Sequence, residues 1–313
     1  MKRILILGAS GFIGQNLVNY FSRFDYKLYG TYLKNKPKLN SKVKYIKIDL
    51  KNKKKVSKII KNIDIVIQSA AVTGGIKDAK NNPAKYIADN AIMNSVIFEA
   101  IFYSTVKHLI FLSCSVMYES SYKKLKEKDF NANGNIYPSY FGGAWNKVYF
   151  EKMCEYYSRI CFTKFTVIRH SNVYGPHDKF DLENSHLCSA TIKKVIDNND
   201  KFINVWGNGK EKRDLLFIDD LTRAIKLSIR YQKTKFEIFN IGSGVAISVG
   251  KLVKKIIYIA DKKIKINFDL TKPTNNFSVS LDSSKAYKIL KWKPKYNIDQ
   301  GLKKTINWYK KNF

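Results

Sequence analysis

Three glycines near the start of the chain have the spacing of a phosphate-binding turn. Gly8, Gly11 and Gly14 follow a short apolar run and open a stretch of helix-compatible residues. In such a turn the first glycine allows a tight bend, the second lets a phosphate approach the backbone, and the third allows close helix packing. The helix then directs its N-terminal N–H groups at the anion. The motif predicts a dinucleotide site, against the alternative of a plain turn, formed by Gly8, Ser10, Gly11, Phe12, Ile13 and Gly14.

Further candidate cofactor contacts lie where later apolar runs end. The second run ends at 30–34 without the acid that binds the adenosine ribose in NAD-selective enzymes, and Lys34 is placed to bind a 2′-phosphate instead. NADP is therefore the favoured cofactor and NAD the alternative, while a solvated surface lysine is the competing interpretation of Lys34. The other contacts expected at the carboxyl edge of the sheet are Asp49, Leu50, Ala70 and Ala71.

These sites require a parallel sheet to position them. In the first half of the chain, short apolar runs alternate with longer helix-compatible stretches such as Gln15–Phe24 and Val148–Ser158, which is typical of βα units. The pattern predicts an α/β protein with a Rossmann-type doubly wound parallel sheet. Its expected strands are Arg3–Leu7, Lys27–Tyr32, Val43–Ile48, Asp64–Gln68, His108–Ser113 and Thr163–Arg169.

The pattern changes after Gly175 and Pro176, where a polar loop and a lysine-rich helix precede two apolar runs. We expect a dinucleotide-binding domain over 1–174, completed by roughly 215–245, and a smaller C-terminal substrate-binding region over 175–313. The apolar runs of this half are Val205–Gly209, Leu215–Asp220 and Phe236–Ile241, the last of which is expected to be one more core strand.

The composition narrows the choice of partners. The net charge of +32 comes from lysines spread along the whole chain, which favours a compositional bias over a nucleic-acid site, although the field attracts anionic nucleotides. No apolar run has the length of a signal segment or a membrane span, so we expect a cytoplasmic protein without a membrane partner. The four cysteines and four histidines form no metal-ligand or disulfide spacing, so no metal is expected.

Several motifs together resemble the extended short-chain dehydrogenases, the NAD-dependent epimerase/dehydratase family, along nearly the whole chain. The glycine turn is one, and the segments 113–118, 172–176 and 292–294 are others. Within the family, the segments 174–178, 184–186 and 205–207 are similar to GDP-L-fucose synthase-like nucleotide-sugar enzymes. The resemblance implies a further cofactor contact at Asn90 and a homodimer joined through two helices per subunit, for which the helix around Val148–Tyr157 is suitable.

The family's hydride chemistry uses a tyrosine four residues before a lysine, because the ammonium lowers the pKa of the phenol and holds the nicotinamide ribose. Lys147 matches this lysine, but Gly143 stands where the phenol is expected. Glycines at 142 and 143 have no local rationale within a predicted helix. Tyr140, two turns before Lys147 on the same helical face, is the preferred substitute, and an ordinary packed aromatic is the competing interpretation.

The family's catalytic hydroxyl falls on Cys114, which is a poor hydrogen-bond donor, so the flanking Ser115 or Ser113 could supply the oxygen after a small backbone shift. The cysteine that fucose synthases use for epimerisation falls on Val116, whereas its histidine partner is present as His186. One epimerising group is thus absent, and His186 is expected to contact the sugar, with a surface loop histidine as the alternative.

The resemblance and the residue types also suggest the substrate contacts. Arg213 suits a diphosphate clamp, because a guanidinium binds two oxygens at once, and Lys272 is a weaker candidate for the same anion. Trp206 could pack on the base or the sugar, and a core tryptophan is the alternative. The complete predicted set is Asn172, Asn184, His186, Trp206, Arg213 and Lys272.

Three functions remain open from the sequence. The first is an NAD(P)-dependent oxidoreductase of a nucleotide sugar, most simply a GDP-sugar 4-keto reductase in surface-polysaccharide synthesis. The second is a redox-neutral epimerase or dehydratase that retains NAD. The third is a non-catalytic dinucleotide-binding sensor or scaffold, which Gly143 and Cys114 make conceivable.

Overall fold

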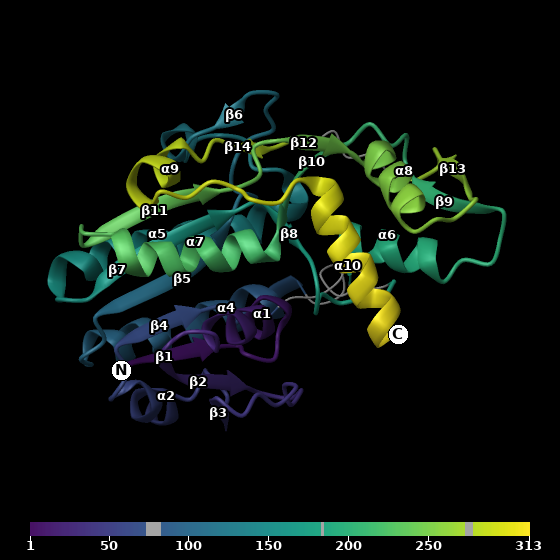
Figure 1. Ribbon diagram of the computed structural model, residues 1–313. Helices are drawn as coiled ribbons and strands as arrows, with labels where there is room; N and C mark the ends of the chain where they lie inside the picture. Colours follow the sequence, from purple (N-terminus) through teal and green to yellow (C-terminus); the bar gives the residue numbers. More distant parts are fainter. Residues whose placement is uncertain (73–82, 183–184, 273–277) are drawn as a thin grey trace.

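The protein is described by a computed structural model that covers residues 1–72, 83–182, 185–272 and 278–313. Its centre is a seven-stranded sheet in which every neighbouring pair is parallel, in the order β11-β7-β5-β4-β1-β2-β3 (Figure 1). This confirms the predicted Rossmann-type doubly wound sheet. The strands are β1 (Lys2–Leu7), β2 (Tyr26–Tyr32), β3 (Val43–Lys47), β4 (Ile65–Gln68), β5 (His108–Cys114), β7 (Lys164–His170) and β11 (Phe236–Ile241).

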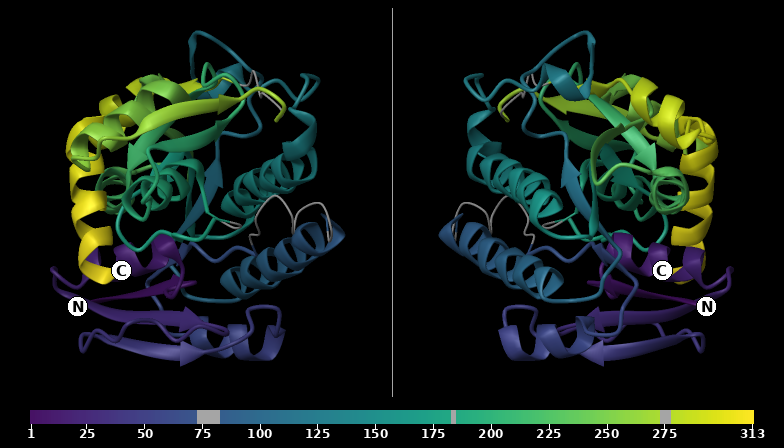
Figure 2. Two further views of the ribbon diagram at one scale, coloured as in Figure 1. Left: turned by 90° about the vertical axis from the view of Figure 1, so that its right-hand side faces the viewer. Right: turned by 90° about the vertical axis from the view of Figure 1, so that its left-hand side faces the viewer.

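Helices cover both faces of this sheet. One face packs against α2 (Lys53–Ile60), α4 (Pro83–Phe102) and α5 (Phe141–Ile160), and the other against α1 (Phe12–Phe21) and α7 (Ile218–Tyr231). Figure 2 shows α4 and α5 side by side on one flank of the molecule. Because both faces are buried, the inner strands β1, β4 and β5 are largely apolar. Alternate residues therefore serve different cores, with Leu5 and Phe111 facing α4 and Ile4 and Leu112 facing α1 and α7.

The remaining elements gather at one end of the sheet and along its rim (Figure 1). The short strands form one three-stranded sheet, β12-β10-β8, and two pairs, β13-β9 and β14-β6. The C-terminal helix α10 contributes Leu302 and Ile306 to the core that also holds Leu17 of α1, so the two predicted regions share packing. The elements are β6 (Lys124–Leu125), β8 (Asn172–Tyr174), α6 (Leu187–Ile196), β9 (Phe202–Trp206), β10 (Lys212–Phe217), β12 (Ala246–Ser248), α8 (Val249–Ile259), β13 (Lys265–Asp269), β14 (Ser280–Leu281), α9 (Ser284–Leu290) and α10 (Ile298–Asn312), with 3₁₀ turns η1 (Glu127–Asp129) and η2 (Pro138–Tyr140).

Two apolar runs of the second half do not form single elements. The run Val205–Gly209 contains the end of β9 at Trp206, and Gly207 and Gly209, with φ of +72° and +68°, form the turn that follows. The apolar run Leu215–Asp220 is divided, since β10 ends at Phe217 and α7 begins at Ile218. Asp219 and Asp220 then occupy the first turn of α7, where acidic side chains stabilise the helix N-terminus.

None of the helices in the described part of the chain combines the length and the apolar character that crossing a membrane requires.

Candidate active site

The glycine turn between β1 and α1 forms a tight, open cradle. Gly8 has a φ of +80°, and a Cβ atom there would lie 2.7 Å from the Cα atom of Ala70. A Cβ atom on Gly14 would lie 2.0 Å from the Gly8 oxygen, so α1 packs directly on the turn. A Cβ atom on Gly11 would meet only the Gly8 oxygen, at 3.5 Å, and no side chain caps the helix. The space before the N–H groups of α1 is therefore open, and the residues fit a dinucleotide pyrophosphate.

Ser10, Phe12 and Ile13 are the other members of this turn. The backbone oxygen of Ser10 accepts a hydrogen bond from Gln15 Nε2 at 2.9 Å, which fixes the turn to the helix that follows. Phe12 and Ile13 are half-buried and pack on the core beneath. These residues therefore fix the shape of the turn, and backbone N–H groups face its open side.

The predicted cofactor contacts of the sheet edge follow the carboxyl ends of the strands. Lys34 is exposed two residues beyond β2, and exposed Asp49 and buried Leu50 follow β3. After β4 come half-buried Ala70 and exposed Ala71. The structure thus brings all five positions to the edge of the sheet at which the glycine turn lies.

Asn90 of α4 holds the chain that follows β4. Its Oδ1 atom accepts a hydrogen bond from the backbone N–H of Val72, and its Nδ2 atom donates to the Val72 oxygen, both at 2.9 Å. Nδ2 also donates to the Tyr86 oxygen at 2.7 Å. Both sides of the amide are therefore used by the backbone, so Asn90 fixes the position of the chain that follows β4.

Lys147 of α5 reaches the end of β5. Its Nζ atom donates a hydrogen bond to the Leu112 oxygen at 2.7 Å and lies 4.9 Å from the centre of the Phe111 ring. Burial lowers the pKa of the Lys147 ammonium, and Cys114 and Glu151 oppose this shift. The lysine that the family motif predicts is therefore next to Cys114.

Cys114 is the last residue of β5 and is half-buried. Burial raises the pKa of its thiol, and the nearby Lys147 opposes this shift. Ser113 faces the opposite side of the sheet, where its Oγ donates a hydrogen bond to Glu151 Oε1 at 2.5 Å. Ser115 is buried, and its backbone oxygen accepts from the Tyr118 N–H at 3.2 Å. Cys114 is therefore the member of this group that lies beside the lysine.

The glycine pair lies in the first turn of α5, which begins at Phe141. The expectation of a pair in the helix interior is thus corrected, because both glycines lie in the first turn of α5. A Cβ atom at Gly142 would approach Ile87 Cδ1 at 3.0 Å, whereas one at Gly143 would meet no atom of the described residues within 4 Å. The direction in which the family's phenol would leave the backbone is open space.

Tyr140 precedes α5 as its N-cap residue, outside the helical face on which it was expected. Its ring centre lies 5.6 Å from that of Tyr137. Burial raises the pKa of the Tyr140 phenol, Arg213 lowers it, and Cys114 is among the groups that raise it. The structure therefore brings Tyr140 together with Arg213 and Cys114.

Arg213 extends from β10 on the substrate side. Its Nη2 atom lies 3.3 Å from Glu211 Oε2, its Nη1 atom donates to the Lys212 oxygen at 2.9 Å, and the side chain is 14% exposed. Trp206 is 57% exposed at the end of β9, and therefore is not the core tryptophan of the competing interpretation. Lys272 is exposed just beyond β13, the partner strand of β9.

The other predicted substrate contacts lie around β8 and α6. Asn172, exposed at the start of β8, donates from Nδ2 to the Asp214 oxygen at 3.3 Å. His186 is exposed as the N-cap residue of α6 and lowers the pKa of the buried Asp178 carboxyl, which burial raises. Asn184 lies outside the described residues.

Sequence reasoning missed His170, the last residue of β7. Its Cα position is paired with that of Cys114 in the β5–β7 register, and its Nδ1 atom lies 2.8 Å from the Ser171 oxygen. Burial lowers the pKa of His170 to about 4, the Ser171 hydrogen bond opposes this, and Lys147 and His186 add to it. A histidine directly after a predicted apolar strand was the available signal.

A buried ion pair beneath the site was also missed. Arg169 of β7 contacts Glu151 of α5, with Nη2 to Oε2 at 2.6 Å and both side chains at most 4% exposed. Arg169 also donates from Nη1 to the Tyr118 hydroxyl at 2.9 Å. The pair ties α5 to the sheet directly below Cys114 and Lys147.

Comparison with known proteins shows similarity along almost the whole chain. The GDP-L-fucose synthase of Sinorhizobium fredii is 28% identical over 99% of this chain and 96% of its own length. Among solved structures, the UDP-glucose 4-epimerase of Thermotoga maritima matches 99% of both chains with a TM-score of 0.88 at 23% identity. The UDP-glucuronic acid 4-epimerase of Bacillus cereus, solved with UDP-glucuronic acid and NAD, has a TM-score of 0.84 at 24% identity and matches 99% of this chain and 100% of its own.

The family model described as the NAD dependent epimerase/dehydratase family matches residues 4–242. This span runs from β1 through the glycine turn, Cys114 and Lys147 to the end of β11. It confirms the predicted family, and with it the prediction of an NAD(P)-dependent enzyme. The chain belongs to the NAD dependent epimerase/dehydratase family.

Proposed function

We propose that the protein is an NAD(P)-dependent oxidoreductase of nucleotide sugars, most simply a GDP-sugar 4-keto reductase. The observation that carries the proposal is the open Gly11 cradle at the edge of the sheet where Cys114 ends β5 and Lys147 of α5 reaches the same strand end. Arg213 lies beyond them, beside Tyr140. A dinucleotide and a second anionic ligand can thus meet at the ends of β5 and β7. The full-length similarity to a GDP-L-fucose synthase supports a GDP-linked substrate.

The bound dinucleotide would supply hydride transfer, and the chain's own residues bind and orient the two ligands. The turn at Gly8, Gly11 and Gly14 would bind the pyrophosphate, and Lys34 a 2′-phosphate. Lys147 would hold the nicotinamide ribose next to Cys114. The net charge of +32 favours the approach of both anionic ligands.

On the substrate side, Arg213 would bind the diphosphate as a two-pronged donor. Trp206, exposed at the end of β9, offers a surface on which the base can pack, with Lys272 near its anionic part. His186 and Asn172 would contact the sugar, together with Ser115 behind Cys114. Tyr140 supplies a phenol between Cys114 and Arg213, where it can contact the sugar close to the diphosphate.

A redox-neutral epimerase or dehydratase that retains NAD is the second candidate. The observation in its favour is the fold, which matches UDP-sugar 4-epimerases along almost the whole chain. A non-catalytic dinucleotide-binding protein is the third candidate, because Gly143 stands where the family's catalytic phenol is expected.

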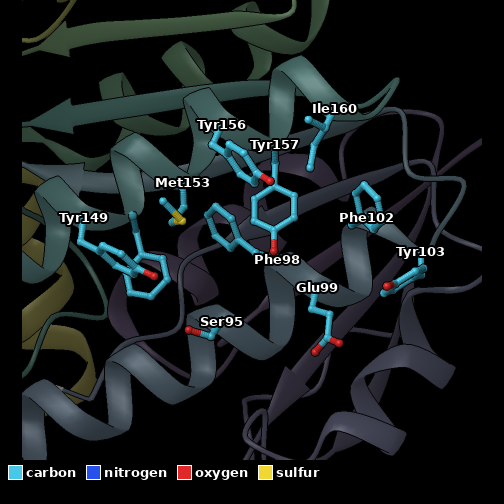
Figure 3. A pocket seen from close by; sticks show the side chains of 11 residues that line it. Ser95, Phe98, Glu99, Phe102, Tyr103, Tyr149, Met153, Tyr156, Tyr157 and Ile160 are labelled. Carbon is cyan, nitrogen blue, oxygen red and sulfur yellow. The ribbon is translucent and has the colours of Figure 1, made fainter.

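We also propose that the protein is a homodimer joined through α4 and α5. A groove of about 490 Å³ runs between these helices and is lined mainly by aromatic side chains (Figure 3). Around it, Tyr103 is 79% exposed, Tyr149 51% and Tyr156 52%. An exposed apolar face of this kind is costly in water, and two copies can cover it through one symmetric contact.

The test is incubation of the purified protein with NADPH, NADH or NAD and a panel of GDP- and UDP-sugars, including a GDP-4-keto sugar, followed by absorbance at the nicotinamide band and product chromatography. Net oxidation of NADPH by the GDP-4-keto sugar is the expected result. An isomerised product with no net change in free nicotinamide favours the epimerase instead. Binding without conversion of any sugar contradicts an enzymatic role.

A further inference from the structure

The site lacks the tyrosine whose phenol the family motif places four residues before Lys147, because Gly143 occupies that position. A side chain at Gly143 would enter open space, and Lys147 instead has Cys114 and His170 as titratable neighbours. Tyr140 is the N-cap residue of α5 and lies beside Arg213, so we assign it to the substrate side of the site. The titratable neighbours of Lys147 are therefore the candidates to carry the proton when a sugar hydroxyl is oxidised or a ketone reduced.

His170 has the position for this task. It ends β7 as Cys114 ends β5, and the two residues are directly paired in the parallel register. Neighbouring parallel strands lie about 4.8 Å apart, so the imidazole and the thiol start from adjacent points at the carboxyl edge of the sheet. In doubly wound folds this is the edge at which ligands bind.

The hydrogen bond of His170 selects one tautomer. Its Nδ1 atom lies 2.8 Å from the Ser171 oxygen, which can only accept, so Nδ1 carries the proton. In neutral imidazole, Nε2 then has the lone pair. Within the described part of the chain, Nε2 has no hydrogen-bond partner.

The surroundings keep this imidazole neutral. Burial lowers the pKa of His170 to about 4, the Ser171 hydrogen bond opposes this shift, and Lys147 from α5 and His186 at the start of α6 add to it. The thiol of Cys114, from β5, is held protonated because burial raises its pKa. At neutral pH, Nε2 is therefore a proton acceptor beside an ammonium and a thiol.

We propose that His170 is the acid–base residue of this site, in place of the missing tyrosine. In the oxidative direction the sugar O–H and C–H bonds break, the proton forms an N–H bond at Nε2, and the hydride forms a C–H bond on the nicotinamide ring. The sugar carbon loses two electrons, which the dinucleotide gains. In the reductive direction each change is reversed, after Nε2 of the neutral imidazole has taken up a proton from water. This inference rests on the proposed function and leaves Tyr140 as a substrate contact.

Nuclear magnetic resonance of ¹⁵N-histidine protein tests the inference without turnover. The chain has four histidines, and the spectrum of His170→Gln assigns the His170 signal by its loss. At pH 7 the expected signal is that of neutral imidazole protonated at Nδ1, and it should remain neutral down to about pH 5. A signal protonated at Nε2, or an imidazolium at pH 7, would overturn the proposal.

Turnover of the sugar that the wild type converts gives the second readout. His170→Gln should lower kcat about 100-fold or more, the usual contribution of a general acid–base group, while calorimetric NADPH affinity and KM change little. His177→Gln is the matched control, because His177 contacts Asn19 and Trp308 away from this edge, and it should keep the wild-type kcat. Tyr140→Phe should mainly raise KM.

The outcomes separate the two proposals. A wild type that converts no nucleotide sugar contradicts the proposed function, and the inference with it. An active wild type whose His170→Gln variant keeps kcat within about threefold, or loses NADPH affinity in proportion to kcat, contradicts the role of His170 alone.

Discussion

Replacing Gly143 with alanine should stabilise the protein. Among the residues that the structure describes, none has an atom within 4 Å of a Cβ atom at this position, so we expect no steric cost. Alanine is favoured over glycine in helices by up to about 1 kcal/mol, largely because the unfolded chain loses freedom. Gly143 is the third residue of α5, so we expect about 0.5–1 kcal/mol of added unfolding free energy. Gly142→Ala is the matched control, since its Cβ atom would lie 3.0 Å from Ile87 Cδ1 and lose part of this gain.

Urea unfolding of the ligand-free variants, followed by circular dichroism, measures both effects. The account predicts a higher midpoint for Gly143→Ala with an unchanged slope, and a smaller rise or none for Gly142→Ala. Gly143→Tyr would then place a phenol one turn before Lys147, and we expect it to restore part of the turnover lost in His170→Gln. Destabilisation by Gly143→Ala would refute the open space, and with it the explanation of the missing phenol.

Three further predictions follow from buried groups and from the exposed groove. Arg169→Met leaves the Glu151 carboxylate buried without its cation, so the unfolding free energy in urea should fall by about 3–5 kcal/mol, and a loss below about 1 kcal/mol would contradict a buried pair. Burial lowers the pKa of His108 to about 3 and that of His170 to about 4 in the folded state. The stabilisation from keeping both imidazoles neutral is therefore complete above about pH 6.5, the pKa of histidine in the unfolded chain, and is lost as the pH falls toward 4. Each group should lower the unfolding free energy by up to about 1.4 kcal/mol per pH unit. Urea titrations between pH 4.5 and 7.5 measure this slope, which His170→Gln should reduce. Tyr156→Glu should convert the dimer to a monomer, measured by sedimentation velocity, without a change in the unfolding free energy of the subunit. A wild-type protein that already sediments as a monomer would refute the interface.

The central sheet could be predicted because its signal is local. Each strand is a short apolar run bounded by polar residues, and the ends of β1 and β11 were correct to within one residue. The run Leu215–Asp220 could not be divided in the same way, because strand and helix are both apolar where β10 meets α7. Only the packing of Ile218 and Leu221 into the core on the α1 side distinguishes the helix.

The site was predictable only where a motif is local. Gly8, Gly11 and Gly14 act through neighbouring backbone, and Lys147 follows from its motif. The pairing of Cys114 with His170 depends on the register of β5 against β7, which no local pattern contains.

Calorimetric titration of stripped protein with NADPH and with NADH, repeated on Lys34→Ala, tests the central claim most directly. The account predicts one site per chain for a nicotinamide dinucleotide, loss of binding when Gly11→Val fills the cradle, and a preference for NADPH that Lys34→Ala removes. Equal binding of both dinucleotides by the wild type would contradict the role of Lys34. Absence of binding, or full binding by Gly11→Val, would contradict the dinucleotide site itself.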